Sequence, residues 1–283
     1  MRPYLRYPGA KWSRVRWILS FLPPTSAYTC YIEPFAGSAA CFFSLRSVPE
    51  QVVLNDLSGD LVNLFRMLRE RPEELAALVA LTPWARGEYE QSFVHSGEPL
   101  EDARRFLVSC WQAHGPRLHS RSGWSRAGRA SPLLLSRWWQ LPDRVAAVAE
   151  RLCWAQIECR SAFDLLTDVN YWHHKVLWYI DPPYVLSTRH ERYYQHELDA
   201  AGHATLLELL DAHPGMVVLS GYQSALYDTR LADWGRVSTP SWTEGGHRRQ
   251  EVLWLNQAAL SALAHRQLSL FPDTEEEDSE KEE

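Results

Sequence analysis

The run Val176–Ile180 consists only of apolar residues and ends at Asp181-Pro182-Pro183-Tyr184. A short apolar run followed by a turn signal is typical of a strand buried on both faces, as in the parallel sheet of an α/β protein. Ligands of open α/β sheets bind beyond the carboxyl ends of the strands, where this tetrapeptide would lie. The two prolines remove two N–H donors and fix φ twice, so we expect a rigid loop.

The side chains of this loop suit the chemistry of an amine attached to an aromatic ring. The Asp181 carboxylate and the Pro182 carbonyl can accept both hydrogens of such an amine, and Tyr184 can stack on its ring. Two acceptors would pull the nitrogen toward a tetrahedral shape and free its lone pair to attack a methyl group. The alternative is a strand that ends in a β-turn opened by Asp181.

The chain has 283 residues, enough for one large domain or for one domain with an insertion. Its net charge of −6 is concentrated at one end, because the stretch from Asp273 onward carries eight acids against the single base Lys281. The rest of the chain is near neutral, so the overall charge does not exclude nucleic acid. No apolar run is long enough to span a membrane. The five cysteines are interpreted as reduced core thiols of a cytoplasmic protein: Cys30, Cys41, Cys110, Cys153 and Cys159.

The N-terminal part predicts two β-α units and a turn that carries a lysine. A strand at 28–32 leads into Glu33-Pro34-Phe35-Ala36-Gly37-Ser38, and we expect a helix at 41–46 after this small-residue turn. A second strand at 51–54 ends at Asp56, about 20 residues past the glycine loop, as in sites that bind ribose hydroxyls. Asp56 could instead lie in the N-cap region of a helix at 61–69.

Upstream, Pro8-Gly9 predicts a turn just before Lys11. Ser13 is the expected N-cap of a helix at 14–21. A single lysine after a turn is more often only a solvated charge.

From residue 72 to 152 the strand-like pattern stops, and helices are expected at 72–81, 101–111 and 143–152. Between them, residues 114–137 form a glycine-interrupted stretch with several arginines and no acid. Such a stretch suits contacts to phosphates and bases, although basic loops are often only solvated. The candidate DNA-binding residues, which include two arginines of the basic and aromatic segment 187–195, are Arg117, Arg121, Trp124, Arg126, Arg129, Arg189 and Arg192.

The strand pattern resumes at 156–159, and Asp164 follows this strand. Its carboxylate could bind a cofactor base or cap a short helix. Further on we expect helices at 203–212 and 225–231, a strand at 216–220, and a hairpin made by strands at 235–238 and 251–256 around Gly245-Gly246.

Taken together, these motifs resemble the DNA adenine methylase family over about residues 4–256. Residues 6–12 resemble its first cofactor motif, residues 33–40 its Asp/Glu-Pro-Phe-x-Gly-x-Gly loop, and Asp181–Tyr184 its catalytic motif, all in the family's order. The resemblance implies a Rossmann-like S-adenosylmethionine-dependent methyltransferase sheet with an inserted, mostly helical target-recognition domain. The catalytic domain would span 1–71 and 153–262, the insertion 72–152, and a tail 263–283.

By the same resemblance, S-adenosyl-L-methionine would be bound by Tyr7, Lys11, Glu33, Phe35, Gly37, Asp56, Asp164 and Asp181, and the catalytic residues would be Asp181, Pro182, Pro183 and Tyr184, without a metal. Ala39 departs from the family pattern because it replaces the second loop glycine, and we expect a helix-entry backbone with negative φ to tolerate it. Tyr7 stands where some members have tryptophan.

The resemblance implies methylation of adenine N6 in double-stranded DNA, with base flipping. We expect a bacterial monomer, and the sequence is compatible with an orphan methylase, a member of a restriction-modification system or a phage-encoded enzyme. The alternatives are another amine, such as cytosine N4, RNA adenine or a protein glutamine amide, and a DNA-binding module without turnover.

The C-terminal segment carries a separate resemblance, to the short peptide by which bacterial proteins dock on the replicative sliding clamp. The residues expected to bind the clamp lie just past the last predicted domain element and are Gln267, Leu268, Leu270 and Phe271. The alternative is a segment folded against the body of the protein.

Overall fold

The structure is a computed structural model, and it describes residues 2–115, 121–126, 132–188, 193–242 and 248–270. Within these residues the strands form one sheet of seven, in the order β3-β2-β1-β4-β5-β7-β6. The first five strands of this order are parallel, whereas β7 runs antiparallel to both β5 and β6. The strands are β1 (Cys30–Glu33), β2 (Gln51–Asn55), β3 (Gln156–Glu158), β4 (Val176–Ile180), β5 (Met216–Tyr222), β6 (Gly235–Trp242) and β7 (Arg248–Leu255). This sheet confirms the expected Rossmann-like α/β class.

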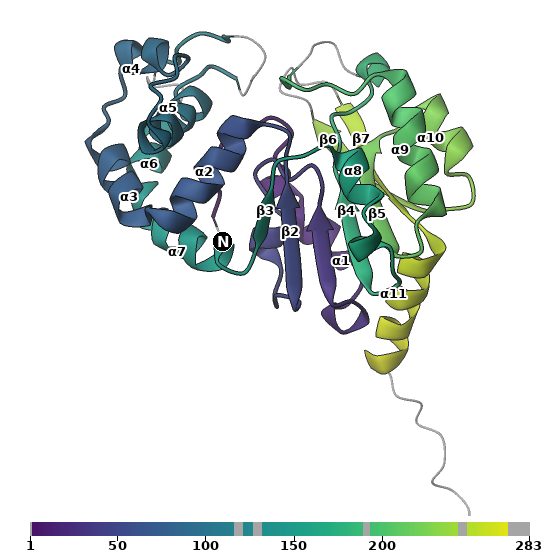
Figure 1. Cartoon of the computed structure of the whole chain (residues 1–283). Helices are drawn as coiled ribbons and strands as arrows, with labels where there is room; N and C mark the ends of the chain where they lie inside the picture. Colours follow the sequence, from purple (N-terminus) through teal and green to yellow (C-terminus); the bar gives the residue numbers. More distant parts are fainter. Residues whose placement is uncertain (1, 116–120, 127–131, 189–192, 243–247, 271–283) are drawn as a thin grey trace, which may run out of the picture.

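Most of the α-helices lie to the left or to the right of the strands in Figure 1. The helices on the left come between β2 and β3 in the chain and form a lobe beside the β3 edge. It comprises α2 (Gly59–Glu70), α3 (Pro72–Leu81), α4 (Arg86–Gln91), α5 (Pro99–Trp111), α6 (Pro132–Trp139) and α7 (Pro142–Leu152). The remaining helices are α1 (Val15–Ser20), α8 (Ala162–Leu166), α9 (Ala200–Ala212), α10 (Ala225–Arg230) and α11 (Gln257–Leu270).

The strands are buried on both faces because alternate side chains enter two different cores. In β4, Leu177 and Tyr179 belong to the core that includes residues of α1 and α2, whereas Trp178 and Ile180 belong to the core with α9. Burying this much apolar surface stabilises the sheet and leaves the ends of its strands as the place for polar side chains.

Several local predictions are wrong. The helix expected at 41–46 is only a 3₁₀ turn, η3 (Phe42–Ser44). Ala39 has a φ of 48°, in the left-handed region, so the expected negative φ does not explain its tolerance. Ser13 does not cap α1, because it ends the 3₁₀ turn η1 (Lys11–Ser13) and Arg14 precedes the helix.

Two further expectations need correction. Cys153 and Cys159 are exposed, so only the other three cysteines are core thiols. The last helix, α11, extends through residue 270, so the segment 267–270 is not past the last element. Among the described residues, no helix is long and apolar enough to cross a membrane.

Candidate functional site

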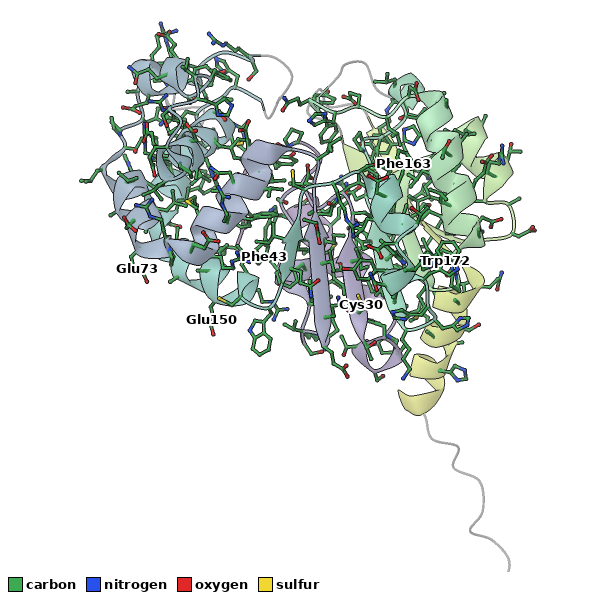
Figure 2. The ribbon with its side chains drawn as sticks, in the orientation of Figure 1. Cys30, Phe43, Glu73, Glu150, Phe163 and Trp172 are labelled. Carbon is green, nitrogen blue, oxygen red and sulfur yellow. The ribbon has the colours of Figure 1, made fainter. Side chains whose placement is uncertain are left out.

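A cavity that is partly open to solvent lies at the carboxyl ends of β1, β2 and β4. Figure 2 labels Phe163, one of its lining residues, at this end of the sheet, while Cys30 at the start of β1 lies toward the other end. Seven of the eight expected cofactor residues line it: Tyr7, Lys11, Glu33, Phe35, Gly37, Asp56 and Asp181. The folded chain therefore gathers into one cavity residues that are separated by up to 174 positions in the sequence.

Asp181 directly follows β4 and continues the alternation of that strand, so its side chain is on the same face as Tyr179 and Leu177. Its Oδ2 atom accepts a hydrogen bond of 2.6 Å from Lys11 Nζ. Its Oδ1 atom is buried and has no hydrogen-bond partner among the described residues. Because burial disfavours the charged form, the pKa of Asp181 lies above its ordinary value, although Lys11 lowers it.

Lys11 is buried in η1, and its ammonium bridges the loop and the sheet. Besides Asp181 it donates to the Gly9 carbonyl at 3.0 Å and lies 3.8 Å from Glu251 Oε1. Burial disfavours the charge on Lys11, but the two carboxylates outweigh burial and raise its pKa above the ordinary value. The ammonium therefore keeps its proton and holds Asp181 in place.

Tyr184 is held at its hydroxyl. The hydroxyl donates to Glu251 Oε1 and lies 3.1 Å from Ser220 Oγ. Its ring contacts the Tyr222 ring edge-on, with centroids 4.6 Å apart, and Lys11 Nζ lies 4.9 Å from its centroid. The orientation of this aromatic ring is thereby fixed beside Asp181.

The small-residue loop after β1 is tied to the end of β2. Asp56 Oδ2 accepts from the Gly37 N–H at 2.9 Å, and Oδ1 accepts from the Ser58 N–H at the same distance. Gly37 has a φ of 49°, and an added Cβ would approach the Tyr7 ring to 3.3 Å, so glycine suits this position. Ser58, not Asp56, is the N-cap of α2.

Glu33, at the end of β1, is 2% exposed. Its Oε1 accepts from the Tyr31 hydroxyl at 2.8 Å and from the Phe42 N–H at 2.7 Å. Burial raises the pKa of Glu33 to about 8, in spite of these two donors. Near neutral pH this carboxyl is therefore mostly uncharged.

Not all of the remaining expected site residues line the cavity. Asp164 is exposed on α8 and does not line the cavity, and Ser161 caps that helix instead. Of the other expected catalytic residues, Pro183 lines the cavity, whereas the buried Pro182 and the half-buried Tyr184 do not. Within the described part of the chain, no group of three or more His, Cys, Asp or Glu could hold a metal ion.

Three of the expected DNA-binding residues are described, and they lie in the lobe. Arg121 is exposed and its guanidinium lies 4.7 Å from the Phe93 ring centre. Trp124 is half-buried: the Arg86 guanidinium lies 5.1 Å from its ring, and its N–H donates to Gln112 at 3.4 Å. Arg126 is exposed, whereas Arg117, Arg129, Arg189, Arg192 and the clamp residue Phe271 lie outside the described residues.

Sequence reasoning missed Glu251 and Ser220 as members of the site. The period of two puts Glu251 on the same face of β7 as Leu253 and Leu255, which are both fully buried. The sequence signal for Glu251 is a carboxylate at the end of a buried strand face. The residues that this carboxylate contacts lie at distant positions in the chain, so the sequence does not identify them.

The sheet order, the cavity and the loop after β4 define a Rossmann-like α/β fold of the methyltransferase type. Within this class, residues 7–118 match the family described as D12 class N6 adenine-specific DNA methyltransferase. The match covers about two fifths of the chain and lies within the stretch whose motifs resemble the DNA adenine methylase family.

Three curated relatives are each similar to about a quarter of the chain. A type II methyltransferase, M1.LlaDCHI, of Lactococcus lactis subsp. cremoris is 33% identical over 79 residues, which are 28% of this chain and 26% of the relative. The type II methyltransferase M.CviBI of Paramecium bursaria Chlorella virus NC1A is 35% identical over 24% of this chain and 25% of its own. A DNA adenine methylase of Haemophilus influenzae is 37% identical over 24% of this chain and 22% of its own. The matched segments thus span about a quarter of each relative's length.

Proposed function

We propose that this chain transfers a methyl group from S-adenosyl-L-methionine to the N6 amine of adenine in double-stranded DNA. The observation that carries the proposal is the Oδ1 atom of Asp181, which is buried and has no hydrogen-bond partner among the described residues, in a residue that lines the cavity. A buried acceptor left without a donor is unfavourable, so a ligand that brings an N–H to it gains a hydrogen bond.

The cavity residues fit the expected methyl donor. Asp56 lies at the end of β2, where acids bind ribose hydroxyls, and the left-handed Gly37 lets the backbone approach a ligand closely. Tyr7, Phe35 and Phe163 supply apolar and aromatic walls. When bound, the donor would supply an electrophilic methyl group.

The protein's own groups would act by positioning. Tyr184 would stack on an adenine swung out of the duplex, which costs a few kcal/mol. Asp181 Oδ1 and the Pro182 carbonyl would accept the two N6 hydrogens and leave the lone pair free to attack the methyl carbon. As the N–C bond forms and the C–S bond breaks, the proton lost from N6 would pass to solvent.

Residues 72–152, which contain every helix of the lobe except α2, are the proposed target-recognition domain, beside a catalytic domain of 1–71 and 153–262. The support for this recognition domain is the acid-free basic stretch 114–137 in the sequence and the exposure of Arg121 and Arg126. The five other DNA-contact candidates remain predictions.

Product analysis tests the proposal and its rivals together. The wild-type protein would be incubated with S-adenosyl-L-methionine and, separately, with plasmid DNA, total RNA and mixed protein, and the modified products would be identified by mass spectrometry. We expect N6-methyladenine in DNA alone. N4-methylcytosine, methylated RNA or methylated glutamine would favour the corresponding rival, and the absence of any product would favour a binding module.

We also propose that residues 267–271 dock on a sliding clamp, and the order of Gln267, Leu268, Leu270 and Phe271 supports this. Because 267–270 end α11, docking of an extended peptide would require these last turns to unwind. In a pull-down with purified clamp, the substitutions Leu270→Ala and Phe271→Ala should together abolish binding and leave methylation of short duplexes unchanged. Binding retained by the double variant would refute the proposal.

A further inference from the structure

Glu251 is a buried acid of the site that the methyl-transfer scheme above does not use. It is 2% exposed, on the face of β7 that carries Leu253 and Leu255, at the end of the sheet where Asp181 lies. One atom, Oε1, accepts hydrogen bonds from the Tyr184 hydroxyl and from Ser220 Oγ, the latter at 3.0 Å. Lys11 Nζ is 3.8 Å from the same atom.

Glu251 contacts Tyr184 only at the hydroxyl, at one end of the tyrosine ring. The two prolines restrict the backbone that leads to Tyr184, but the side chain can still rotate about its two torsions. A charge-assisted hydrogen bond at the hydroxyl fixes the direction in which the ring points, because the acceptor belongs to a strand in the sheet. The hydroxyl lies on the axis about which the ring plane turns, so that rotation is restricted instead by the contacts with Tyr222 and Lys11.

We propose that Glu251 is a positioning residue for methyl transfer: its carboxylate anchors the Tyr184 hydroxyl and so holds the ring in one position for the target base. This inference rests on the proposed function, in which Tyr184 stacks on adenine. Glu251 itself does not touch the base or the donor in this account. Its effect reaches the reaction through the orientation of Tyr184.

The first test measures the contact without DNA or methyl donor. Tyrosine labelled with ¹³C at Cζ reports on the bond made by its hydroxyl, and the Tyr184 resonance is the one absent from Tyr184→Phe. In Glu251→Gln this resonance should shift, because a charged acceptor becomes a neutral one. In the control Glu150→Gln, an exposed residue of α7 labelled in Figure 2, it should stay in place. An unchanged Tyr184 resonance in Glu251→Gln would overturn the inference.

The second test measures coupling in single-turnover methyl transfer to plasmid DNA. Loss of a charge-assisted hydrogen bond predicts a 10- to 100-fold lower rate for Glu251→Gln, with the dissociation constant for S-adenosyl-L-methionine, from calorimetry, changed by less than threefold. In the Tyr184→Phe background the same substitution should lower the rate by less than threefold, because the anchored hydroxyl is already absent. A purely structural role would act equally in both backgrounds, and that result would overturn the inference.

Two further outcomes are decisive. If Glu251→Gln does not fold, Tyr184→Phe breaks the same bond from the other side, and a rate within threefold of wild type would refute the anchoring role. If the wild-type protein methylates no DNA, the proposed function fails, and the resonance shift still decides whether Glu251 holds Tyr184.

Discussion

The carboxyl of Glu33 makes stability depend on pH in a direction opposite to that of a salt-bridged acid. Its ordinary pKa is 4.5, and burial raises it to about 8 in the folded protein. Between these values the folded state keeps a proton that the unfolded chain releases. The contribution of Glu33 to stability is therefore fully present below pH 4.5 and is lost as the pH rises through about 8.

The size of this effect follows from the two pKa values. At about 1.4 kcal/mol per pH unit, the loss approaches about 5 kcal/mol above pH 8. The substitution Glu33→Gln mimics the neutral carboxyl and retains an oxygen for Tyr31 and the Phe42 N–H. We therefore expect it to change stability little near pH 4.5 and to stabilise the protein by several kcal/mol at pH 8 to 9.

Urea unfolding followed by tryptophan fluorescence at pH 5, 6, 7, 8 and 9 measures the difference between Glu33→Gln and the wild type. The difference between the two proteins should grow with pH, while the exposed control Glu150→Gln should show no such trend. Stability curves that stay parallel over this range, or a variant that is less stable at every pH, would refute the reasoning.

The remaining predictions concern the left-handed backbone at Ala39 and the buried ammonium of Lys11. Ala39→Gly should change the free energy of unfolding by less than about 1 kcal/mol, because relief of left-handed strain offsets the lost methyl and the added chain entropy. The buried helical control Ala103→Gly should cost about 2 kcal/mol, and equal losses in urea unfolding would contradict the strain argument. Lys11→Met leaves Asp181 and Glu251 buried without their cation and should destabilise by about 3 to 5 kcal/mol, against little change for the exposed Lys175→Met. An equal effect of both lysine substitutions would show that the buried ion pairs are not important for stability.

Much of the fold follows from local patterns. The strand β4 begins and ends at the predicted residues, because an apolar run bounded by Asp-Pro-Pro has few other interpretations. The helix α3 also matches its prediction, with Pro72 at its first turn. By contrast, α4 and α6 were not predicted, because they are short and lie next to glycine- and arginine-rich stretches that show no clear periodicity.

The residues of the candidate site were likewise predicted only in part from the sequence. Asp181, Asp56 and Lys11 were found because each follows a strand or turn with a recognisable motif. Glu251 was not, because its role depends on hydrogen bonds to Tyr184 and Ser220, which are 67 and 31 positions away in the sequence. The left-handed φ of Ala39 was also missed, since the residue type gives no sign of it.

The central claim is that Asp181 activates an amine beside a bound methyl donor, and the single-turnover rate of tritiated methyl transfer to plasmid DNA by Asp181→Ala tests it most directly. Removal of a preorganised hydrogen-bonding group at a reacting centre typically lowers the rate by two to three orders of magnitude. We predict a rate at least 100-fold below that of the wild type, in a variant whose folding is verified by urea unfolding. A rate within tenfold of the wild type would contradict the account.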